Sequence, residues 1–111
     1  MFCRVATTFA ALADPTRRQI LDLLLERPRP VGELVDLLPL SQPGVSRHLR
    51  VLRDASLVTV RAEAQRRVYA VRPDPLAELD AWLAPYRRLW AGRLAALERH
   101  LDDTDPRKER P

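Results

Sequence analysis

The sequence has few of the residues that build disulfides, metal centres or membrane spans. Its 111 residues include one cysteine, Cys3, which excludes an intrachain disulfide and a zinc site built from several cysteines of one chain. No apolar run approaches the roughly 20 residues of a membrane-spanning helix. The N-terminal residues lack a charged region followed by a long apolar core. We therefore expect a cytoplasmic chain without a signal peptide or a membrane partner.

Catalytic side chains are equally scarce. The histidines His48 and His100 and the single cysteine form no recognisable pairing of a nucleophile with a base. Ser46 and His48 stand two positions apart in a predicted helix, so their side chains diverge. We expect no enzymatic activity, no cofactor and no metal ion.

Basic charge is abundant, and it is concentrated in one third of the chain. The formal net charge is +4, but residues 41–72 contain seven arginines against two acidic residues, and the remainder is slightly acidic. A localised basic block indicates a polyanionic partner. On charge alone, an ordinary solvated face would explain the block as well.

Hydrophobic periodicity predicts three helices before this block. The first covers 2–13 and carries a narrow seam that contains Phe2, Val5 and Phe9. The second begins at Asp14-Pro15, because aspartate caps free backbone donors and proline suits the first helical position. The third covers 31–38. The apolar residues of the second and third helices that we expect to face inward are Ile20, Leu21, Leu24, Leu25, Leu34, Leu37 and Leu38.

The segment from Leu40 to Leu52, LSQPGVSRHLRVL, predicts a helix that packs on a core with one side and meets DNA with the other. Ser41 is a capping residue, and Pro43 lies in the first turn. Val45, Leu49 and Leu52 share one side of the helical wheel, and Ser46, Arg47 and Arg50 share the other. Gln42 stands at the N-terminal end, where a recognition helix meets base edges. Together with the preceding helix, this segment is typical of a helix-turn-helix.

After residue 55 the pattern becomes extended. Residues 57–62 and 66–71 are rich in valine, threonine and tyrosine, which predicts two short strands. The connection 63–65 contains no glycine, asparagine or aspartate, so the signal for a tight turn is weak. Arg61, Arg66 and Arg67 would surround the tip of this hairpin and contact phosphates, which contribute affinity but little specificity.

A last helix is predicted over 76–101, with Pro85 either kinking it or splitting it. Trp82, Tyr86 and Trp90 recur every four residues and would form either a dimer core or a pocket for a small apolar effector of unknown identity. Residues 102–111 are charged and contain proline, so we expect a disordered tail.

Three runs carry a family resemblance: ALADPTRRQIL (11–21), VGELVDLLPLSQPGVSRHLRVLRDASLV (31–58) and RRVYAVRP (66–73). Together they resemble the ArsR family of bacterial winged-helix repressors. The resemblance implies a mainly α fold with five helices and a two-stranded wing, forming one domain over 1–101. It also implies a homodimer built from the first and last helices, with each recognition helix in a major groove of a palindromic operator.

The sequence departs from the family pattern at several positions. Pro30 and Gly32 stand where metal-sensing members carry a cysteine pair, and neither side chain can bind a metal. WLAPYRRLW (82–90) resembles a branch that does not sense metals through that site. Ser56 replaces the usual glycine after the recognition helix, and the wing lacks its common glycine.

The resulting function is a DNA-binding transcriptional regulator whose partners are double-stranded DNA and a second copy of the chain. The predicted DNA-binding residues are Ser41, Gln42, Pro43, Ser46, Arg47, His48, Arg50, Arg61, Arg66 and Arg67. The predicted dimer interface comprises Phe2, Val5, Phe9, Leu83, Tyr86, Trp90, Leu94 and Leu97. One alternative is a metal- or redox-responsive sensor that uses Cys3, His100 and Asp102. Another is a winged-helix module that binds protein instead of DNA.

Overall fold

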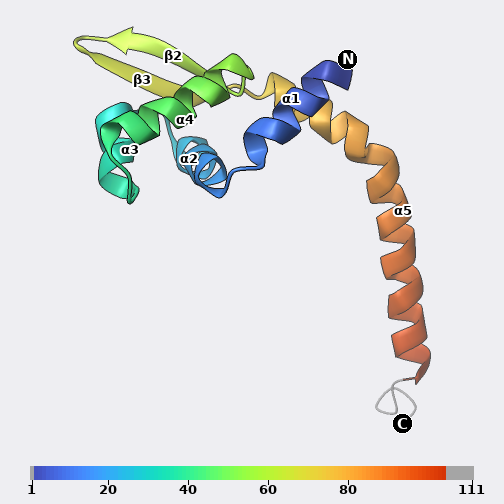
Figure 1. The fold of residues 1–111 in the computed structure, drawn as a ribbon. Coiled ribbons are helices and arrows are strands. Elements are labelled where there is room, and N and C mark those ends of the chain that lie inside the picture. The colour runs from blue at the N-terminus through green and yellow to red at the C-terminus, as the bar shows by residue number, and fades with distance from the viewer. Residues whose placement is uncertain (1, 105–111) are drawn as a thin grey trace. The chain divides into compact units, whose positions relative to one another are not determined.

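The computed structural model describes residues 2–104, which fall into two compact units divided between Leu79 and Asp80. The side chains of residues 2, 3, 103 and 104 lie outside the description. The elements, in chain order, are α1 (Phe2–Leu12), α2 (Pro15–Glu26), β1 (Arg29–Pro30), α3 (Val31–Leu37), α4 (Gln42–Asp54), β2 (Val58–Glu63), β3 (Arg66–Val71) and α5 (Asp74–Thr104) (Figure 1).

The core of the first unit lies where α2, α3 and α4 meet the base of the sheet. Ile20, Leu34 and Leu52 are fully buried, and Leu49 is 1% exposed. Val45, Leu49 and Leu52 are the predicted inner residues of α4, and all three are buried. The 3.6-residue period of α4 therefore fixes its rotation, which leaves its polar side facing outward.

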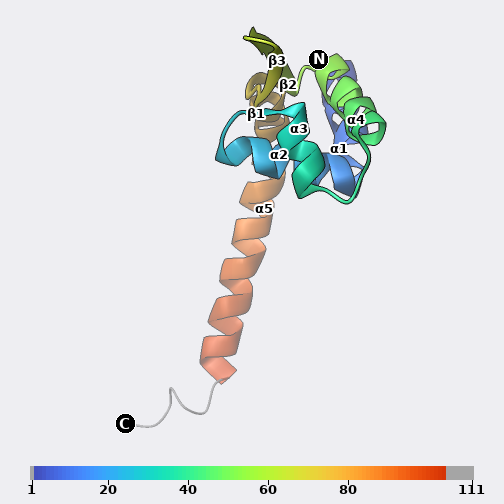
Figure 2. The same cartoon turned by 90° about the vertical axis from the view of Figure 1, so that its left-hand side faces the viewer.

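The strands form a three-stranded antiparallel sheet in the order β1-β3-β2. The hairpin of β2 and β3 was predicted, but the two-residue strand β1 was not. Arg29 pairs with Tyr69 and Pro30 with Val68, and the chain then enters α3 directly (Figure 2). A strand of two residues is too short to show an alternating pattern in the sequence, and proline, which has no N–H to donate, is a poor strand signal.

The starts of α2 and α4 differ. The Asp14 carboxylate accepts hydrogen bonds from the backbone N–H groups of Thr16, at 2.7 Å, and Arg17, at 3.2 Å, which confirms the predicted cap and the first-position Pro15. Ser41 occupies the N-cap position of α4, but its side chain makes no capping hydrogen bond. The prediction that Ser41 caps α4 is therefore right for the position and wrong for the hydroxyl group.

The end of α4 is a Schellman motif. The N–H of Leu57 donates to the carbonyl of Leu52, and the N–H of Ser56 donates to that of Arg53, both at 2.9 Å. Ser56 has a φ of 61°, the left-handed conformation that glycine adopts at least cost. The turn therefore forms without a glycine, and Ser56 adopts the strained conformation in its place.

Two inward-facing predictions are wrong. Leu25 is 76% exposed and Leu37 is 51% exposed, whereas their neighbours Leu24 and Leu38 are buried. Each exposed leucine lies at the edge of the buried face of its helix, beyond the residues that pack in the core. Leu25 lines the side of a shallow apolar cleft with Leu21.

The second unit consists of the α5 residues from Asp80 onward. The helix is continuous through Pro85, which excludes the second of the two alternatives, a kink or a split, although the missing N–H leaves the carbonyl of Ala81 without its helical donor. It also runs to Thr104, beyond the boundary predicted at 102. The remaining tail, 105–111, lies outside the described residues.

Candidate DNA-binding surface

A groove separates the outer side of α4 from the β2–β3 hairpin, which we call the wing. Both come from the first unit, and Figure 1 shows the wing extending beside α4. The charged residues that line the groove are six arginines and four acidic residues: Arg27, Arg50, Arg53, Arg61, Arg66, Arg67, Glu33, Asp36, Asp54 and Glu63. The groove is therefore basic overall, with acidic groups interspersed.

The outer side of α4 supplies one wall of this groove. Gln42, Ser46 and Arg50 are exposed and line it, as expected for residues four positions apart on a helix. Ser41, Pro43 and Arg47 are also exposed but are not among the lining residues. Within the described residues, the side chains of Arg47 and Arg50 form no hydrogen bond or ion pair. Their guanidinium groups are available to a ligand.

The wing supplies the opposite wall. Glu63 lies opposite Arg66 in the strand register, and Ala62 lies opposite Arg67. The turn consists of Ala64 and Gln65, one residue shorter than predicted, and Ala64 has a φ of 55°. All three predicted wing arginines, Arg61, Arg66 and Arg67, are exposed and line the groove.

His48 differs from the other predicted DNA-binding residues because it is half-buried. Its Nδ1 atom is buried and has no hydrogen-bond partner among the described residues. Burial would raise the pKa of Asp14, but hydrogen bonds from the N–H groups of Arg17 and Thr16, with the charges of His48 and Arg17, outweigh it and lower that pKa. His48 thus connects α4 electrostatically to the start of α2.

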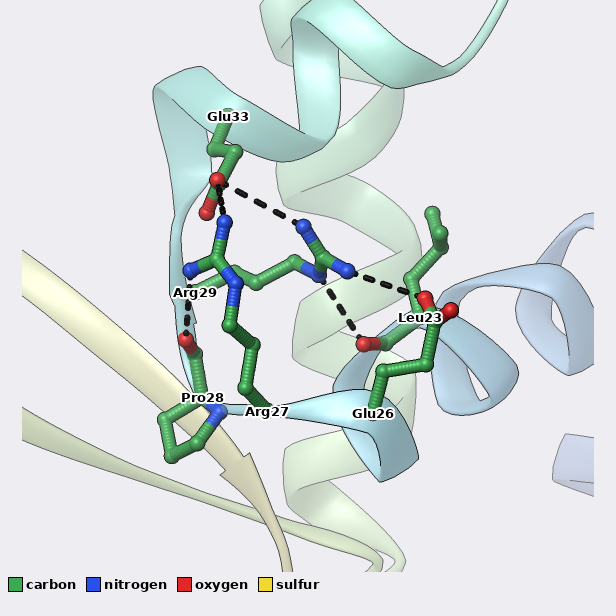
Figure 3. Close-up of polar contacts among 6 residues, drawn as sticks. All are labelled: Leu23, Glu26, Arg27, Pro28, Arg29 and Glu33. Atoms are coloured by element: carbon green, nitrogen blue, oxygen red, sulfur yellow. Dashed lines mark hydrogen bonds and ion pairs between the residues drawn. The ribbon is translucent and has the colours of Figure 1, made fainter.

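An ion-pair cluster holds the floor of the groove where α2, β1 and α3 meet (Figure 3). Arg29 is only 8% exposed. Its Nε donates to the carbonyl of Leu23 at 2.9 Å, its Nη2 to Glu26 at 2.9 Å, and its Nη1 lies 3.4 Å from Glu33. Each nitrogen of this nearly buried guanidinium thus has an acceptor, so removing one acidic partner would leave its charge partly uncompensated. The cluster therefore anchors β1, and β1 anchors the base of the wing through β3.

Glu33 is the centre of that cluster. A hydrogen bond from Arg27, together with the charges of Arg27, Arg29 and Arg66, lowers the pKa of Glu33 despite its partial burial. Arg66 belongs to the wing, so the floor of the groove and the wing are electrostatically linked. Pro30 of β1 and Gly32 of α3 lie between Arg29 and Glu33 in the sequence. These are the two positions at which metal-sensing members of the family would carry cysteines.

The predicted dimer residues divide between the two units. Val5 is 8% exposed and already packs within the first unit, whereas Phe9 is 43% exposed. On α5, Leu83 is half-buried. The exposed apolar residues of the second unit, each 37–67% exposed, are Trp82, Tyr86, Leu89, Trp90, Leu94, Leu97 and Leu101. The predicted contact of Phe2 involves a side chain outside the description.

Two of the three residues in the metal- or redox-sensing alternative have described side chains. His100 and Asp102 lie exposed on α5, and the side chain of Cys3 is not described. Among the described side chains, no cluster of three or more histidine, cysteine or acidic groups is placed to hold a metal ion. No helix within residues 2–104 combines the length and apolarity needed to cross a bilayer.

Several groove residues are absent from the predicted DNA-binding set, among them the possible hydrogen-bond donors Arg27, Arg53 and Gln65. Arg53 follows Ser46 by seven positions and Arg50 by three, so the helical wheel already placed it on the lining side. Arg27 could not be assigned from the sequence, because it reaches the groove only through the fold of β1 against β3.

Comparisons with known proteins agree with this architecture. Residues 14–60 match the family described as "Bacterial regulatory protein, arsR family". The chain is 45% identical over 92 residues to the HTH-type transcriptional regulator Rv2034 of Mycobacterium tuberculosis, a match that covers 83% of each protein. It is 32% identical over 75 residues to the transcriptional repressor SdpR of Bacillus subtilis, covering 68% of this chain and 83% of that one.

A solved structure shows the same fold. The crystal structure of the ArsR family transcriptional regulator RHA00566 matches with a TM-score of 0.73 and 31% sequence identity, covering 82% of this chain and 94% of that chain. Sequence relatives and structural neighbours thus converge on one family. The chain belongs to the ArsR family: it is a DNA-binding transcriptional regulator with a winged helix-turn-helix fold, not an enzyme.

Proposed function

We propose that the protein is a homodimeric repressor that binds a palindromic operator. Each protomer would place α4 in a major groove and the wing on the neighbouring phosphate backbone. The observation that carries this proposal is the unpaired state of Arg47 and Arg50 on the outer side of α4, beside a wing with three further arginines.

The side chains on α4 match the chemistry of base edges. Gln42 can pair with adenine through two hydrogen bonds, and Arg47 and Arg50 can each pair with guanine in the same way. The start of the helix has no side-chain cap, so the backbone N–H groups of Gln42 and Gly44 can attract a phosphate, whereas Pro43 has no N–H to offer. His48 is half-buried, so we assign it a packing role that positions α4 and not a base contact.

The α5 seam supports the dimer. Tyr86, Trp90, Leu94 and Leu97 recur at spacings of four, four and three residues, which is the pattern of a helix that packs along another helix. So many exposed large apolar residues on one helix are unusual for a protein that stays monomeric. A second copy of α5 is the partner that would cover them, and it would set two α4 helices at a fixed separation.

Selection of bound duplexes from a random pool tests the function directly. We expect enrichment of an inverted repeat, and a log–log plot of affinity against salt concentration with a slope near −6, as for about six to eight phosphate contacts in the dimer. Enrichment of a single unrepeated half-site would reject the palindrome. Binding that does not depend on salt would reject the role of the wing.

The dimer has its own test. Leu94→Glu places a charge in the α5 seam, so we expect monomers in sedimentation analysis and an operator affinity lower by at least tenfold, about 1.4 kcal/mol. Leu25→Glu is the matched control, because Leu25 is 76% exposed and lies outside the seam. A Leu94→Glu protein that stays dimeric would show that another surface holds the two protomers together.

A further inference from the structure

The tip of the wing contains one carboxylate between two arginines. Glu63 Oε2 lies 3.3 Å from Arg61 Nη2, and Glu63 Oε1 lies 3.9 Å from Arg66 Nη2. Each carboxylate oxygen therefore engages a different guanidinium. All three side chains are exposed, by 50–66%, so this contact is made at a surface that a ligand can reach.

The strand register, and not only the side-chain conformations, brings these groups together. Arg61 and Glu63 are two positions apart on β2, so their side chains share one face of the ribbon. Arg66 is the cross-strand partner of Glu63 and points to the same face. Arg67 is opposite Ala62, on the other face, and its side chain makes no ion pair within the described residues.

We propose that Glu63 is an internal substitute for a DNA phosphate, which occupies two of the three wing arginines and thereby limits the affinity of the protein for every duplex. The proposal rests on the proposed function, because it requires the wing to bind the phosphate backbone. A carboxylate and a phosphate are both oxyanions that bind guanidinium groups, so they compete for the same donors.

The consequence is a general reduction in affinity. When the wing meets DNA, Arg61 and Arg66 must exchange Glu63 for a phosphate, so the ion pairs with Glu63 are lost as the phosphate contacts form. Because phosphate contacts are insensitive to sequence, this cost applies equally to operator and non-operator DNA. Glu63 would therefore weaken non-specific retention on DNA while α4 continues to select the site.

The test is the substitution Glu63→Gln, which removes the charge and keeps the shape. Affinity would be measured by fluorescence anisotropy, using the full-length protein and labelled duplexes with and without the selected site. We expect Kd to fall by about three- to tenfold on both duplexes at low salt and the salt slope to steepen by about one. The gain should shrink as salt rises, because exposed charges are screened.

The matched control is Glu78→Gln. Glu78 forms a similar exposed ion pair, with Arg4 at 3.1 Å, and it is not among the residues that line the groove. Glu78→Gln changes the net charge by the same amount as Glu63→Gln. An equal gain in affinity for both variants would show that net charge alone causes the effect and would overturn the proposal. A Glu63→Gln protein that binds like the wild type, or more weakly, would also overturn it.

A double-mutant cycle tests the mechanism. In a background of Arg61→Ala with Arg66→Ala, the gain from Glu63→Gln should largely disappear if Glu63 acts through these arginines. An undiminished gain would show that Glu63 repels DNA directly. It would overturn the proposal that Glu63 takes the place of a phosphate on these arginines. Wild-type protein that fails to bind any duplex would instead reject the proposed function itself, which separates the two failures.

Discussion

The outer side of α4 and the wing carry the same kind of side chain in opposite states. Arg47 and Arg50 of α4 make no ion pair within the described residues, whereas Arg61 and Arg66 of the wing both contact Glu63. Free guanidinium groups on a helix are ready to form directed hydrogen bonds. Paired ones on a hairpin must first release an internal anion. The difference suggests that selectivity and overall affinity are set in separate places.

The supports of the two regions differ as well. The inner side of α4 is buried, with Val45 and Leu52 at 0% exposure, so the helix backbone is held firmly. In the wing, every residue from 61 to 67 is exposed, and burial begins again only at Val68. Base reading requires positions held to fractions of an ångström, but a phosphate contact tolerates a support that is less extensively packed.

The largest predicted effect tests the support of α4. Leu49 is 1% exposed, and Leu49→Ala should reduce the free energy of unfolding by about 2–5 kcal/mol, because it removes buried methyl groups and leaves a cavity. Urea denaturation measures this change. Ala62→Ser at the exposed wing is the control and should shift the same quantity by no more than about 0.5 kcal/mol. Equal losses at both positions would mean that the buried side of α4 and the exposed wing do not differ in how firmly they are packed.

The next effect separates selectivity from affinity. Arg47→Ala should weaken binding to the selected site by about 1–3 kcal/mol while changing non-specific binding much less, because a base contact is lost. Arg66→Ala should weaken binding to all duplexes by a similar factor and make the salt slope shallower by up to about one. Anisotropy titrations on both duplexes distinguish the two patterns, and the reverse assignment would exchange the roles of α4 and the wing.

A smaller effect concerns the strained turn at the tip of the wing. Ala64 has a φ of 55° at the wing tip, so Ala64→Gly should stabilise the protein by about 1 kcal/mol, because glycine adopts this conformation without strain. Ala62→Gly, two residues earlier in a regular strand, should destabilise it by about 0.5–1 kcal/mol. Thermal unfolding of the two variants therefore should shift in opposite directions. Destabilisation by both would mean that the tip is not strained.

Much of the fold could be predicted from the sequence where one local signal was strong. The start of α2 followed from the capping chemistry of Asp14 and Pro15, and the rotation of α4 followed from the spacing of Val45, Leu49 and Leu52. These features depend on residues within one or two helical turns. The wing strands were also predicted within a residue or two, although their turn signal was weak.

The failures depend on distant parts of the chain. Leu25 belongs to an apolar run that is wider than the face the core covers, and only the assembled core shows where burial stops. The partners of Arg29 lie on α2 and α3, so its near-complete burial could not be inferred from an arginine between two prolines. The contact of Glu63 with Arg66 required the hairpin register, which a connection without glycine left undefined.

The smallest predicted effect compares the acidic anchors beside the two regions. The charge of His48 of α4 acts on Asp14, the charge of Arg66 of the wing acts on Glu33, and the pKa of each carboxyl is lowered in the folded protein. A lowered pKa means that the folded state holds the charged form more tightly, so its contribution to stability is complete above the ordinary value, 3.8 for Asp14 and 4.5 for Glu33. That contribution is lost as the pH falls through the folded-state value.

Asp14→Asn and Glu33→Gln should each flatten the loss of stability between about pH 5 and pH 3 in urea denaturation, because the group that takes up a proton on unfolding is gone. Asp22→Asn removes an exposed carboxylate of α2 that forms no hydrogen bond or ion pair within the described residues, so it is the control for this comparison. Asparagine can still cap α2, so Asp14→Asn should retain most of its stability at neutral pH. Glu33→Gln instead takes from the buried Arg29 one of its two acidic partners and leaves Glu26. If it lowered stability at neutral pH less than Asp14→Asn, the cluster beneath the wing would be a weaker anchor than the helix cap beside α4.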